Sequence, residues 1–198
     1  MLEEAKRIAE KITGLHRPGR KAVSHLVRAR KATLFCFADD GETPNHPKWP
    51  LVIYRSPVNL RSDFDPAAIF EDLFASHGWT DSWRDSIYDF LHFHTHRHEV
   101  LGIARGSVQV ACGGAKGKHL RLKAGDVVIL PAGTGHRCIE ASDDLLVVGA
   151  YPQNSCAYDQ PRPKEADHRQ AVRNIAKVAR PKTDPVYGSQ RPLTALWP

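Results

Sequence analysis

The sequence lacks any long hydrophobic run. No stretch of its 198 residues approaches the roughly 20 consecutive apolar residues that a membrane-spanning helix requires. The first seven residues carry two glutamates and lack the apolar core of a signal peptide. We therefore predict a cytoplasmic protein that has no membrane partner.

Cysteine is also scarce, and no internal repeat is visible. A chain of this length does not need the disulfide framework of a small secreted domain, so we expect reduced thiols. The absence of a repeat indicates a single copy of the fold. The four cysteines form no Cys-X-X-Cys pair and are Cys36, Cys112, Cys138 and Cys156.

Most of the sequence has no excess of either charge. Residues 1–31 contain nine Lys or Arg and three Asp or Glu, which accounts for the whole formal charge of +6, while the rest contains 19 of each kind. This basic arm could contact an anionic surface, but a solvated helix and linker explain it as well, and we favour that interpretation. No zinc-finger or aromatic RNA-binding pattern accompanies it, so we do not expect nucleic acid as a partner.

Length and composition favour one domain with extensions. At 41% hydrophobic and 25% charged residues, the chain can bury one core. We assign residues 1–31 to a basic helical arm, 32–160 to the compact domain and 161–198 to a C-terminal helix and tail. Because the tail holds large apolar residues such as Trp197, we expect it to wrap back onto the domain or onto a partner chain.

Hydrophobic periodicity predicts a β-rich core with short peripheral helices. From about Ser86 to Ala150, apolar and polar residues alternate in short segments separated by glycine-rich turns, which is typical of a barrel or sandwich. Two strands are expected before this region and four helices around it. The strands cover residues 33–37 and 51–54, and the helices cover 3–13, the region of Val23 to Val27, the stretch between Asp65 and Gly78, and 164–179 with a stripe of Val172, Ile175 and Val178.

Four of the eleven histidines lie within seven residues. In a strand, side chains two residues apart point the same way, so His92 and His94 can offer ring nitrogens to one ion from the same face. Glu99 follows after enough residues for a turn to return the chain to that face. Further along, a strand and a proline-glycine turn lead to His136, and a hairpin there can bring His136 beside the first cluster.

These residues match two sequence motifs of the cupin superfamily. The first, G(X)5HXH(X)3-4E(X)6G, is matched at His92, His94, Glu99 and Gly106, with Ser86 in place of its leading glycine. The second, G(X)5PXG(X)2H(X)3N, is matched at Gly125, Pro131, Gly133 and His136, with Glu140 in place of its final asparagine. The chain therefore resembles a cupin. This resemblance implies an all-β double-stranded β-helix, or jelly-roll barrel, with short helices at the N-terminus, before the barrel core and at the C-terminus.

Over about residues 35 to 197 the chain is also similar to the uncharacterised YjlB-type cupins. The function of that group is not established, so the similarity adds little about the reaction. It leaves the basic arm unmatched. The similar segments are 37–41, 78–80, 98–102, 147–152 and 184–188.

Carried over residue by residue, the cupin resemblance implies a metal ion bound by His92, His94, Glu99 and His136. Three nitrogens and one oxygen suit Mn, Fe, Co, Ni, Cu or Zn. His96 and His98 lie in the turn between these motif residues, so we expect them at the surface, or His98 in a hydrogen bond that supports a ligand. The alternative is four barrel residues without an ion, but polar groups converging in a dry barrel favour a metal.

Strand alternation also predicts the walls of the site. Tyr88 shares the parity of His92 and would position a substrate. Cys138 and Glu140 share the parity of His136, so either could move a proton. A small buried side chain for Cys138 and a solvated carboxylate for Glu140 are the alternatives.

Leu91 and Phe93 are apolar on the opposite face of the same expected strand. A strand with one face in water would avoid such residues, so the terminal segments or a second chain must cover them. Because cupins commonly pair, we predict a homodimer.

Together these features favour a metal-dependent enzyme that acts on a small polar or aromatic molecule, of oxygenase or isomerase type. The alternative is a non-catalytic cupin that binds a small molecule and acts as a sensor. The barrel hosts many unrelated chemistries, so the sequence leaves the metal, the substrate and the reaction open.

Overall fold

The computed structural model describes residues 15–60, 63–153, 155, 158–163, 167–190 and 192–198. The helix expected over 3–13 lies outside the described residues. The elements are α2 (Gly19–Ser24), β1 (Ala32–Phe35), β2 (Leu51–Tyr54), α3 (Pro66–Ser76), β3 (Trp79–Asp85), β4 (Glu99–Arg105), β5 (Ser107–Cys112), η1 (Gly114–Lys116), β6 (Lys118–Lys123), β7 (Val127–Leu130), β8 (His136–Ala141), β9 (Leu146–Pro152), α4 (His168–Ile175) and α5 (Leu193–Leu196).

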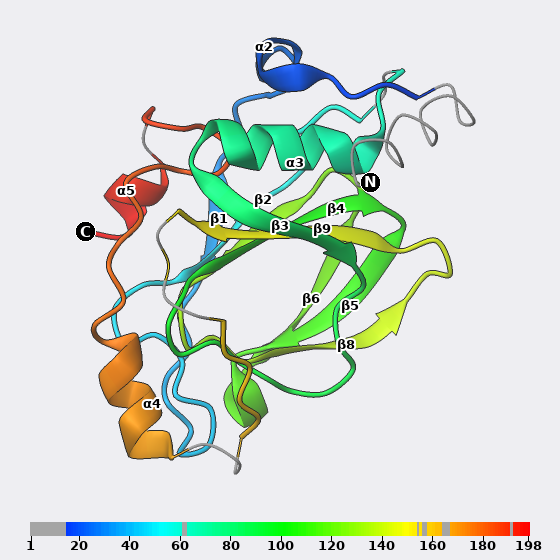
Figure 1. The fold of residues 1–198 in the computed structure, drawn as a ribbon. Coiled ribbons are helices and arrows are strands. Elements are labelled where there is room, and N and C mark those ends of the chain that lie inside the picture. The colour runs from blue at the N-terminus through cyan, green and yellow to red at the C-terminus, as the bar shows by residue number, and fades with distance from the viewer. Residues whose placement is uncertain (1–14, 61–62, 154, 156–157, 164–166, 191) are drawn as a thin grey trace.

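Two antiparallel sheets form the body of the molecule (Figure 1). The larger sheet has the strand order β1-β2-β7-β4-β9-β3, and the smaller has the order β6-β5-β8. One core cluster joins them, because Leu101 and Val128 of the larger sheet pack with Val110 and Leu122 of the smaller. The predicted all-β jelly-roll class is confirmed by this mostly β arrangement of two sheets with few short helices.

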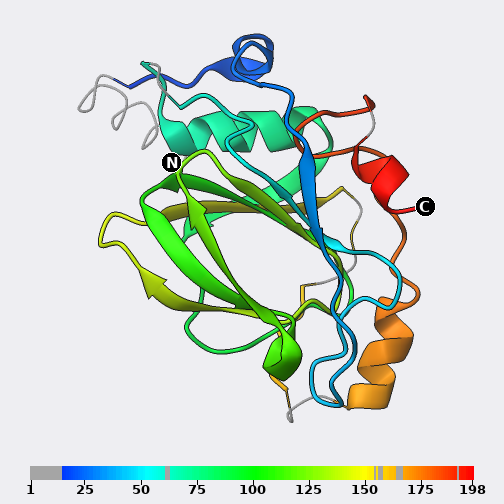
Figure 2. The same ribbon diagram turned by 180° about the vertical axis from the view of Figure 1, so that it is seen from behind.

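The two sheets differ in how many of their faces are buried. β2 and β7 are buried at every residue, whereas β5 and β6 alternate buried and more exposed residues. The larger sheet is covered on its second face by α3 and by the C-terminal tail, as seen from both sides in Figures 1 and 2. Phe70 of α3 lies so close to β4 that a Cβ at Gly102 would approach its ring to 2.5 Å. Continuous apolar runs therefore mark strands that are covered twice.

Helix α3 begins and ends where the sequence predicts. The carboxylate of Asp65 accepts a hydrogen bond from the backbone N–H of Ala67 at 3.0 Å, and Pro66 occupies the first turn. The helix ends at Ser76, and Gly78 follows with a φ of +76°, which glycine adopts without steric cost.

The described part of the basic arm docks on α3. Val23 of α2 is buried in the core cluster beneath it. Arg17 forms ion pairs of 2.9 Å with Glu71 and 2.8 Å with Asp72, both on α3. Part of the positive charge of the arm is therefore balanced within the chain.

The segment that carries the paired histidines is not the regular strand that the sequence predicts. β3 ends at Asp85, and between it and β4 the chain forms only an isolated bridge of His92 with His136. Its backbone instead bonds to distant loops: the N–H of Gly133 donates to the carbonyl of His94 at 2.7 Å. The prediction of a strand here was wrong because these partners are tertiary, and residue alternation cannot reveal them.

The C-terminal segment folds back over the larger sheet. Trp197 is fully buried, stacks on Trp49 with 5.3 Å between ring centroids, and donates its indole N–H to the carbonyl of Pro50 at 2.9 Å. Asp184 is also fully buried and accepts a hydrogen bond from the hydroxyl of Tyr54 at 2.7 Å. These contacts join the tail to the sheet.

Helix α4 covers the apolar face that Phe93 presents. Phe93 is fully buried and packs with Ala171 and Ile175 of this helix. The predicted stripe was wrong at Val172, which is 37% exposed, since the helix turns Ala171 inward instead. Because α4 of the same chain covers Phe93, this residue no longer supports a homodimer. The homodimer stays a prediction.

Two further findings concern the whole described chain. No helix among the described residues combines the length and the apolar character needed to cross a membrane. Within the same residues Cys36, Cys112 and Cys138 are free thiols, while Cys156 lies outside them.

Candidate metal centre

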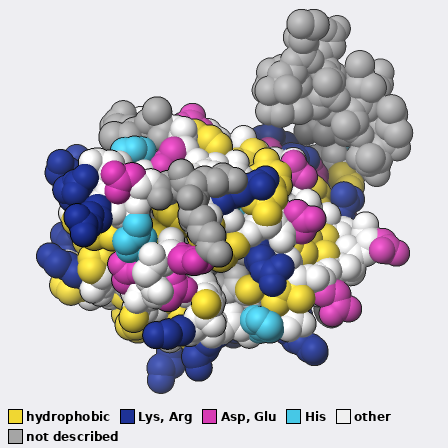
Figure 3. All heavy atoms as spheres, turned by 90° about the horizontal axis from the view of Figure 1, so that it is seen from below, with side chains coloured by type: hydrophobic (Ala, Val, Ile, Leu, Met, Phe, Trp, Pro, Cys, Tyr) yellow, Lys and Arg dark blue, Asp and Glu magenta, His cyan; other side chains and the backbone are white. Residues whose placement is uncertain are grey.

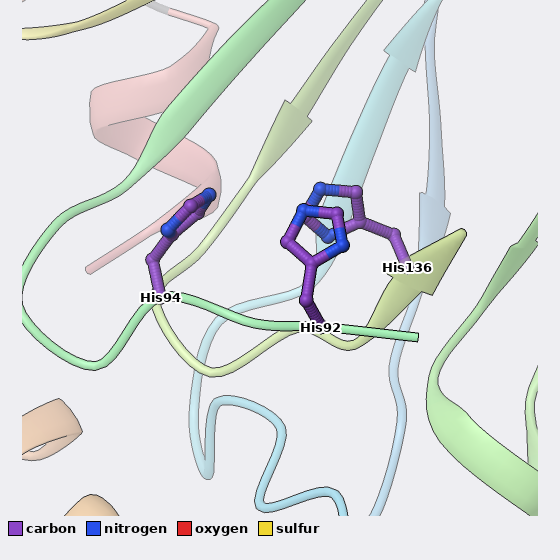
Figure 4. A group of neighbouring side chains, drawn as sticks. All are labelled: His92, His94 and His136. Carbon is purple, nitrogen blue, oxygen red and sulfur yellow. The ribbon is translucent and has the colours of Figure 1, made fainter. Parts of the chain in front are cut away.

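The structure brings His92, His94 and His136 into one buried cluster (Figure 4). One ring nitrogen of each lies within 4.8 Å of the corresponding atoms of the other two. The first two come from the irregular segment before β4, and the third opens β8. The three residues are at most 5% exposed.

Glu99, the first residue of β4, lies beside the cluster. Its Oε2 is 3.4 Å from Nε2 of His94 and 3.4 Å from Nε2 of His136. Burial acts to raise the pKa of Glu99, but the two neighbouring imidazoles outweigh it and hold that pKa well below its ordinary value. A carboxylate charge is therefore fixed next to the histidines.

Backbone carbonyls orient all three rings. A carbonyl oxygen can only accept a hydrogen bond, so each Nδ1 carries the proton and each Nε2 presents its lone pair. Such support by carbonyls is usual for histidines that bind metals. The carbonyls of Phe90, Asp159 and Thr134 lie 3.1, 2.5 and 3.0 Å from Nδ1 of His92, His94 and His136, respectively.

The environment also keeps His92 neutral. Burial, followed by the charge of His136, lowers the pKa of His92 to about 3. For His94, burial acts to lower the pKa, but the nearby Glu99 carboxylate raises it above the ordinary value overall. The three imidazoles form a nitrogen donor set that fits a divalent transition metal and does not select one.

The cluster forms one wall of a cavity of about 370 Å³. This volume suits a small molecule. The exposed Tyr88 lines the cavity as the sequence predicts, and the buried Leu101 lines it as well. Its aromatic walls are Trp83, Tyr88, Tyr151 and Tyr158.

Two of these tyrosines remain protonated at neutral pH. Burial, followed by the charge of Glu99, raises the pKa of Tyr158 to about 12 and that of Tyr151 further. The hydroxyl of Tyr151 accepts a hydrogen bond from the indole of Trp83 at 2.9 Å, and that of Tyr158 donates to Gln160 at 2.7 Å. These walls therefore add no negative charge to the cavity.

The structure places Cys138 and Glu140 outside the cavity lining. β8 contains an irregularity at Ile139: Cys138 lies opposite Val110, but Glu140 lies opposite Gln109. This extra residue breaks the alternation that began at His136. Cys138 consequently packs against the inner core, whereas Glu140 is exposed on the outer surface of the smaller sheet.

His96 and His98 do not join the cluster. His98 is buried rather than at the surface: its Nδ1 accepts a hydrogen bond from the N–H of Ala132 at 2.9 Å, and its Nε2 donates to the carbonyl of Ala179 at 3.2 Å. His96 is half-buried, with Nε2 3.5 Å from the side-chain amide of Asn174. The surface position expected for His98 was wrong because the C-terminal segment covers it.

Several lining residues were not singled out from the sequence, among them Arg97, Trp83, Tyr151 and Tyr158. Arg97 lies inside the first motif, and its 7% exposure is unusual for arginine. Trp83 belongs to β3, a strand that the sequence analysis did not predict. Tyr151 lies in β9, Tyr158 follows that strand, and both reach the cavity through tertiary folding. The one available sequence cue was an arginine placed among the metal-motif residues.

Comparison with known proteins places the chain in a family. No protein-family model matches it. The uncharacterized protein YjlB of Bacillus subtilis (strain 168) is 36% identical over 168 residues, which cover 85% of this chain and 98% of that protein. The chain belongs to the YjlB family. The cupin motifs and the sheets described above place this YjlB-family chain in the cupin superfamily.

Solved cupin structures match the YjlB-family chain only in part. Acireductone dioxygenase from Bacillus anthracis, with a cadmium ion in its active centre, is 19% identical with a TM-score of 0.34, over 46% of this chain and 61% of that one. A mutant of Bacillus subtilis oxalate decarboxylase is 17% identical with a TM-score of 0.35, over 61% of this chain and 30% of that one. This chain thus spans less than two thirds of either. What the site can do chemically is therefore inferred from the geometry of this chain and not from these structures.

Proposed function

We propose that this protein is a metal-dependent cupin enzyme. Its ion would be held by His92, His94, Glu99 and His136, and its substrate would be a small molecule in the adjoining cavity. The supporting observation is that three imidazoles, each held at Nδ1 by a backbone carbonyl, converge in one buried cluster, and that Nε2 of His94 and of His136 lies 3.4 Å from the buried carboxylate of Glu99.

The ion would supply Lewis-acid chemistry of isomerase type or redox chemistry of oxygenase type. The chain's own residues define the space around the substrate. Tyr151 and Leu101 are buried and exclude water from the inner wall. Tyr88, whose ring meets that of His92 edge-on at 5.5 Å between centroids, would position the substrate at the outer wall.

Metal content tests the proposal. Protein purified without a metal-chelating resin is expected to contain one divalent transition ion per chain by elemental analysis. His94→Ala should lose it, because the remaining donors are fewer. His96→Ala is the matched control, since this neighbouring histidine lies outside the cluster, and it should retain the ion. Equal metal content in both variants would contradict the proposed site.

Turnover separates the enzyme from a non-catalytic sensor. Metal-loaded protein would be supplied with a panel of small acids, sugars and phenols, and dioxygen uptake and product formation would be followed. Turnover that disappears in His94→Ala supports the enzyme. Saturable binding across the panel without any product would favour the sensor instead.

A further inference from the structure

A buried positive charge lies in the wall of the metal cavity. Arg97 lines it and is 7% exposed. The central carbon of its guanidinium lies 4.5 Å from the ring centroid of Tyr151 and 5.5 Å from that of Tyr158. Arginine stays charged at any physiological pH, and its planar fork of N–H groups matches the two oxygens of a carboxylate. A cavity with this wall favours an anion.

The same two tyrosines link Arg97 to the histidine cluster. The ring of His94 lies 6.1 Å from that of Tyr151 and 5.2 Å from that of Tyr158, between centroids. Arg97 and His94 therefore lie next to the same pair of aromatic rings. A short molecule lying along these rings can reach the guanidinium and the cluster together.

The other charged groups that line the cavity, within the part of the chain that the structure describes, do not cancel this preference. Asp81 and Asp85 are exposed, so solvent screens their charges. Arg84 is also exposed and is engaged outside the cavity, at 2.7 Å from both Glu71 and Asp65. The buried carboxylate of the cavity, Glu99, contacts two histidines of the cluster.

We propose that the cavity selects small carboxylic acids. Their carboxylate would bind Arg97, and a second oxygen of the same molecule, such as a 2-hydroxyl group, would face the histidine cluster. This assignment of substrate class rests on the proposed metal-dependent function. The neutral tyrosines between the two ends favour acids that carry a flat apolar group.

Matched pairs of acids and amides test the charge preference. Lactate with lactamide, and mandelate with mandelamide, differ by one charge at nearly constant shape. Calorimetric titration of protein loaded with Mn²⁺ should show at least one acid binding at least tenfold more tightly than its amide. Failure of both acids to bind more tightly than their amides would overturn the proposal, and so would tighter binding of inorganic phosphate than of either acid.

Substitution of Arg97 separates its contribution from that of the metal, because a bound ion also attracts carboxylates. Arg97→Gln is expected to weaken acid binding at least tenfold and to leave amide binding nearly unchanged. Arg162→Gln is the matched control: Arg162 is an exposed cation stacked at 4.0 Å on Phe90 and does not line the cavity. It should change acid binding less than twofold. Equal effects of the two substitutions would overturn the role of Arg97.

The outcomes distinguish the two proposals. Thermal melting and Mn²⁺ content of each variant show whether it folds and loads. If Arg97→Gln does not fold, the acid and amide pairs on the unsubstituted protein still decide the charge preference. If the protein takes up no divalent ion, the proposed metal function fails, and the same titrations on metal-free protein decide whether Arg97 selects acids. If it loads Mn²⁺ but Arg97→Gln binds acids normally, only the inference about substrate class fails.

Discussion

Two buried histidines four residues apart show how one segment serves two purposes. His94 faces the cavity, with one nitrogen on a backbone carbonyl and the other beside Glu99. His98 faces away from the cavity: its Nε2 donates to the carbonyl of Ala179 in the C-terminal segment, and its Nδ1 accepts from the N–H of Ala132. Its ring lies 5.0 Å from that of Trp197, between centroids. The residue type and the burial are the same, but the hydrogen bonds differ.

This comparison teaches how to recognise a ligand among buried histidines. The pKa alone does not separate them, because burial lowers it to about 3 both at His92 in the cluster and at His98 outside it. The two kinds of histidine differ at Nε2. In His98 this nitrogen donates a hydrogen bond to the carbonyl of Ala179, whereas in His94 it faces the carboxylate of Glu99 within the cluster. A histidine bonded at both nitrogens has no lone pair left for an ion.

The largest expected effect concerns Trp197 of the C-terminal segment, whose ring lies next to that of His98. Trp197→Ala should lower the free energy of unfolding of the metal-free protein by about 3–5 kcal/mol, because it removes a fully buried ring and its hydrogen bond to the carbonyl of Pro50. Denaturant titration measures this. Tyr88→Ala, at a site that is 47% exposed, serves as the control and should cost under about 1 kcal/mol. A smaller loss for Trp197→Ala than for the control would show that the tail does not support the fold.

The second prediction concerns the replacement of each of the two histidines, His98 and His94, by alanine. His98→Ala should lower the free energy of unfolding by about 1–3 kcal/mol, since the N–H of Ala132 loses its acceptor inside the protein. Its affinity for Mn²⁺ should stay close to that of the unsubstituted protein. His94→Ala should weaken Mn²⁺ binding by roughly 100-fold or more. Reversed results would invalidate the distinction drawn from the second ring nitrogen.

The third prediction uses pH. His98 and His46 have folded-state pKa values of about 3 and about 4, both lowered mainly by burial, against an ordinary value of 6.5. The unfolded chain therefore binds protons between pH 6.5 and 4 that the folded chain does not, so the metal-free protein should lose stability as pH falls through that window. Each histidine contributes at most roughly 1.4 kcal/mol per pH unit.

Thermal melting at pH 7, 6, 5 and 4 checks this third prediction. His98→Gln should flatten the dependence because it removes one such group. A melting temperature that is constant from pH 7 to 4 would show that burial does not suppress protonation of His98.

The smallest expected effect concerns Glu140, which parity alone had placed near His136. Because it is exposed on the outer surface of the smaller sheet, Glu140→Gln should change the free energy of unfolding by less than about 0.5 kcal/mol and leave Mn²⁺ binding unchanged. Cys138→Ala, at a side chain that packs against the inner core, should cost more stability. An effect of Glu140→Gln on metal affinity would revive its role at the site.

Much of the fold followed from local patterns in the sequence. Asp65, Pro66 and Gly78 determined the ends of α3 through capping, a first-turn proline and a left-handed glycine. The apolar run 51–54 predicted β2 with its exact bounds, because a strand buried on both faces needs no alternation. The spacing of two histidine-bearing motifs predicted the three residues that meet in the cluster.

Only the tertiary structure decided what surrounds those residues. The additional residue at Ile139 reversed the face of Glu140, and a long-range contact of Ala179 buried His98. Arg97, just before β4, and Tyr151, in β9, line the cavity together because β4 pairs with β9. Alternation and capping act between residues close in sequence, whereas bulges, covering segments and cavity walls depend on which distant backbone groups pair. Sequence patterns alone therefore determined the cluster, and folding determined its environment.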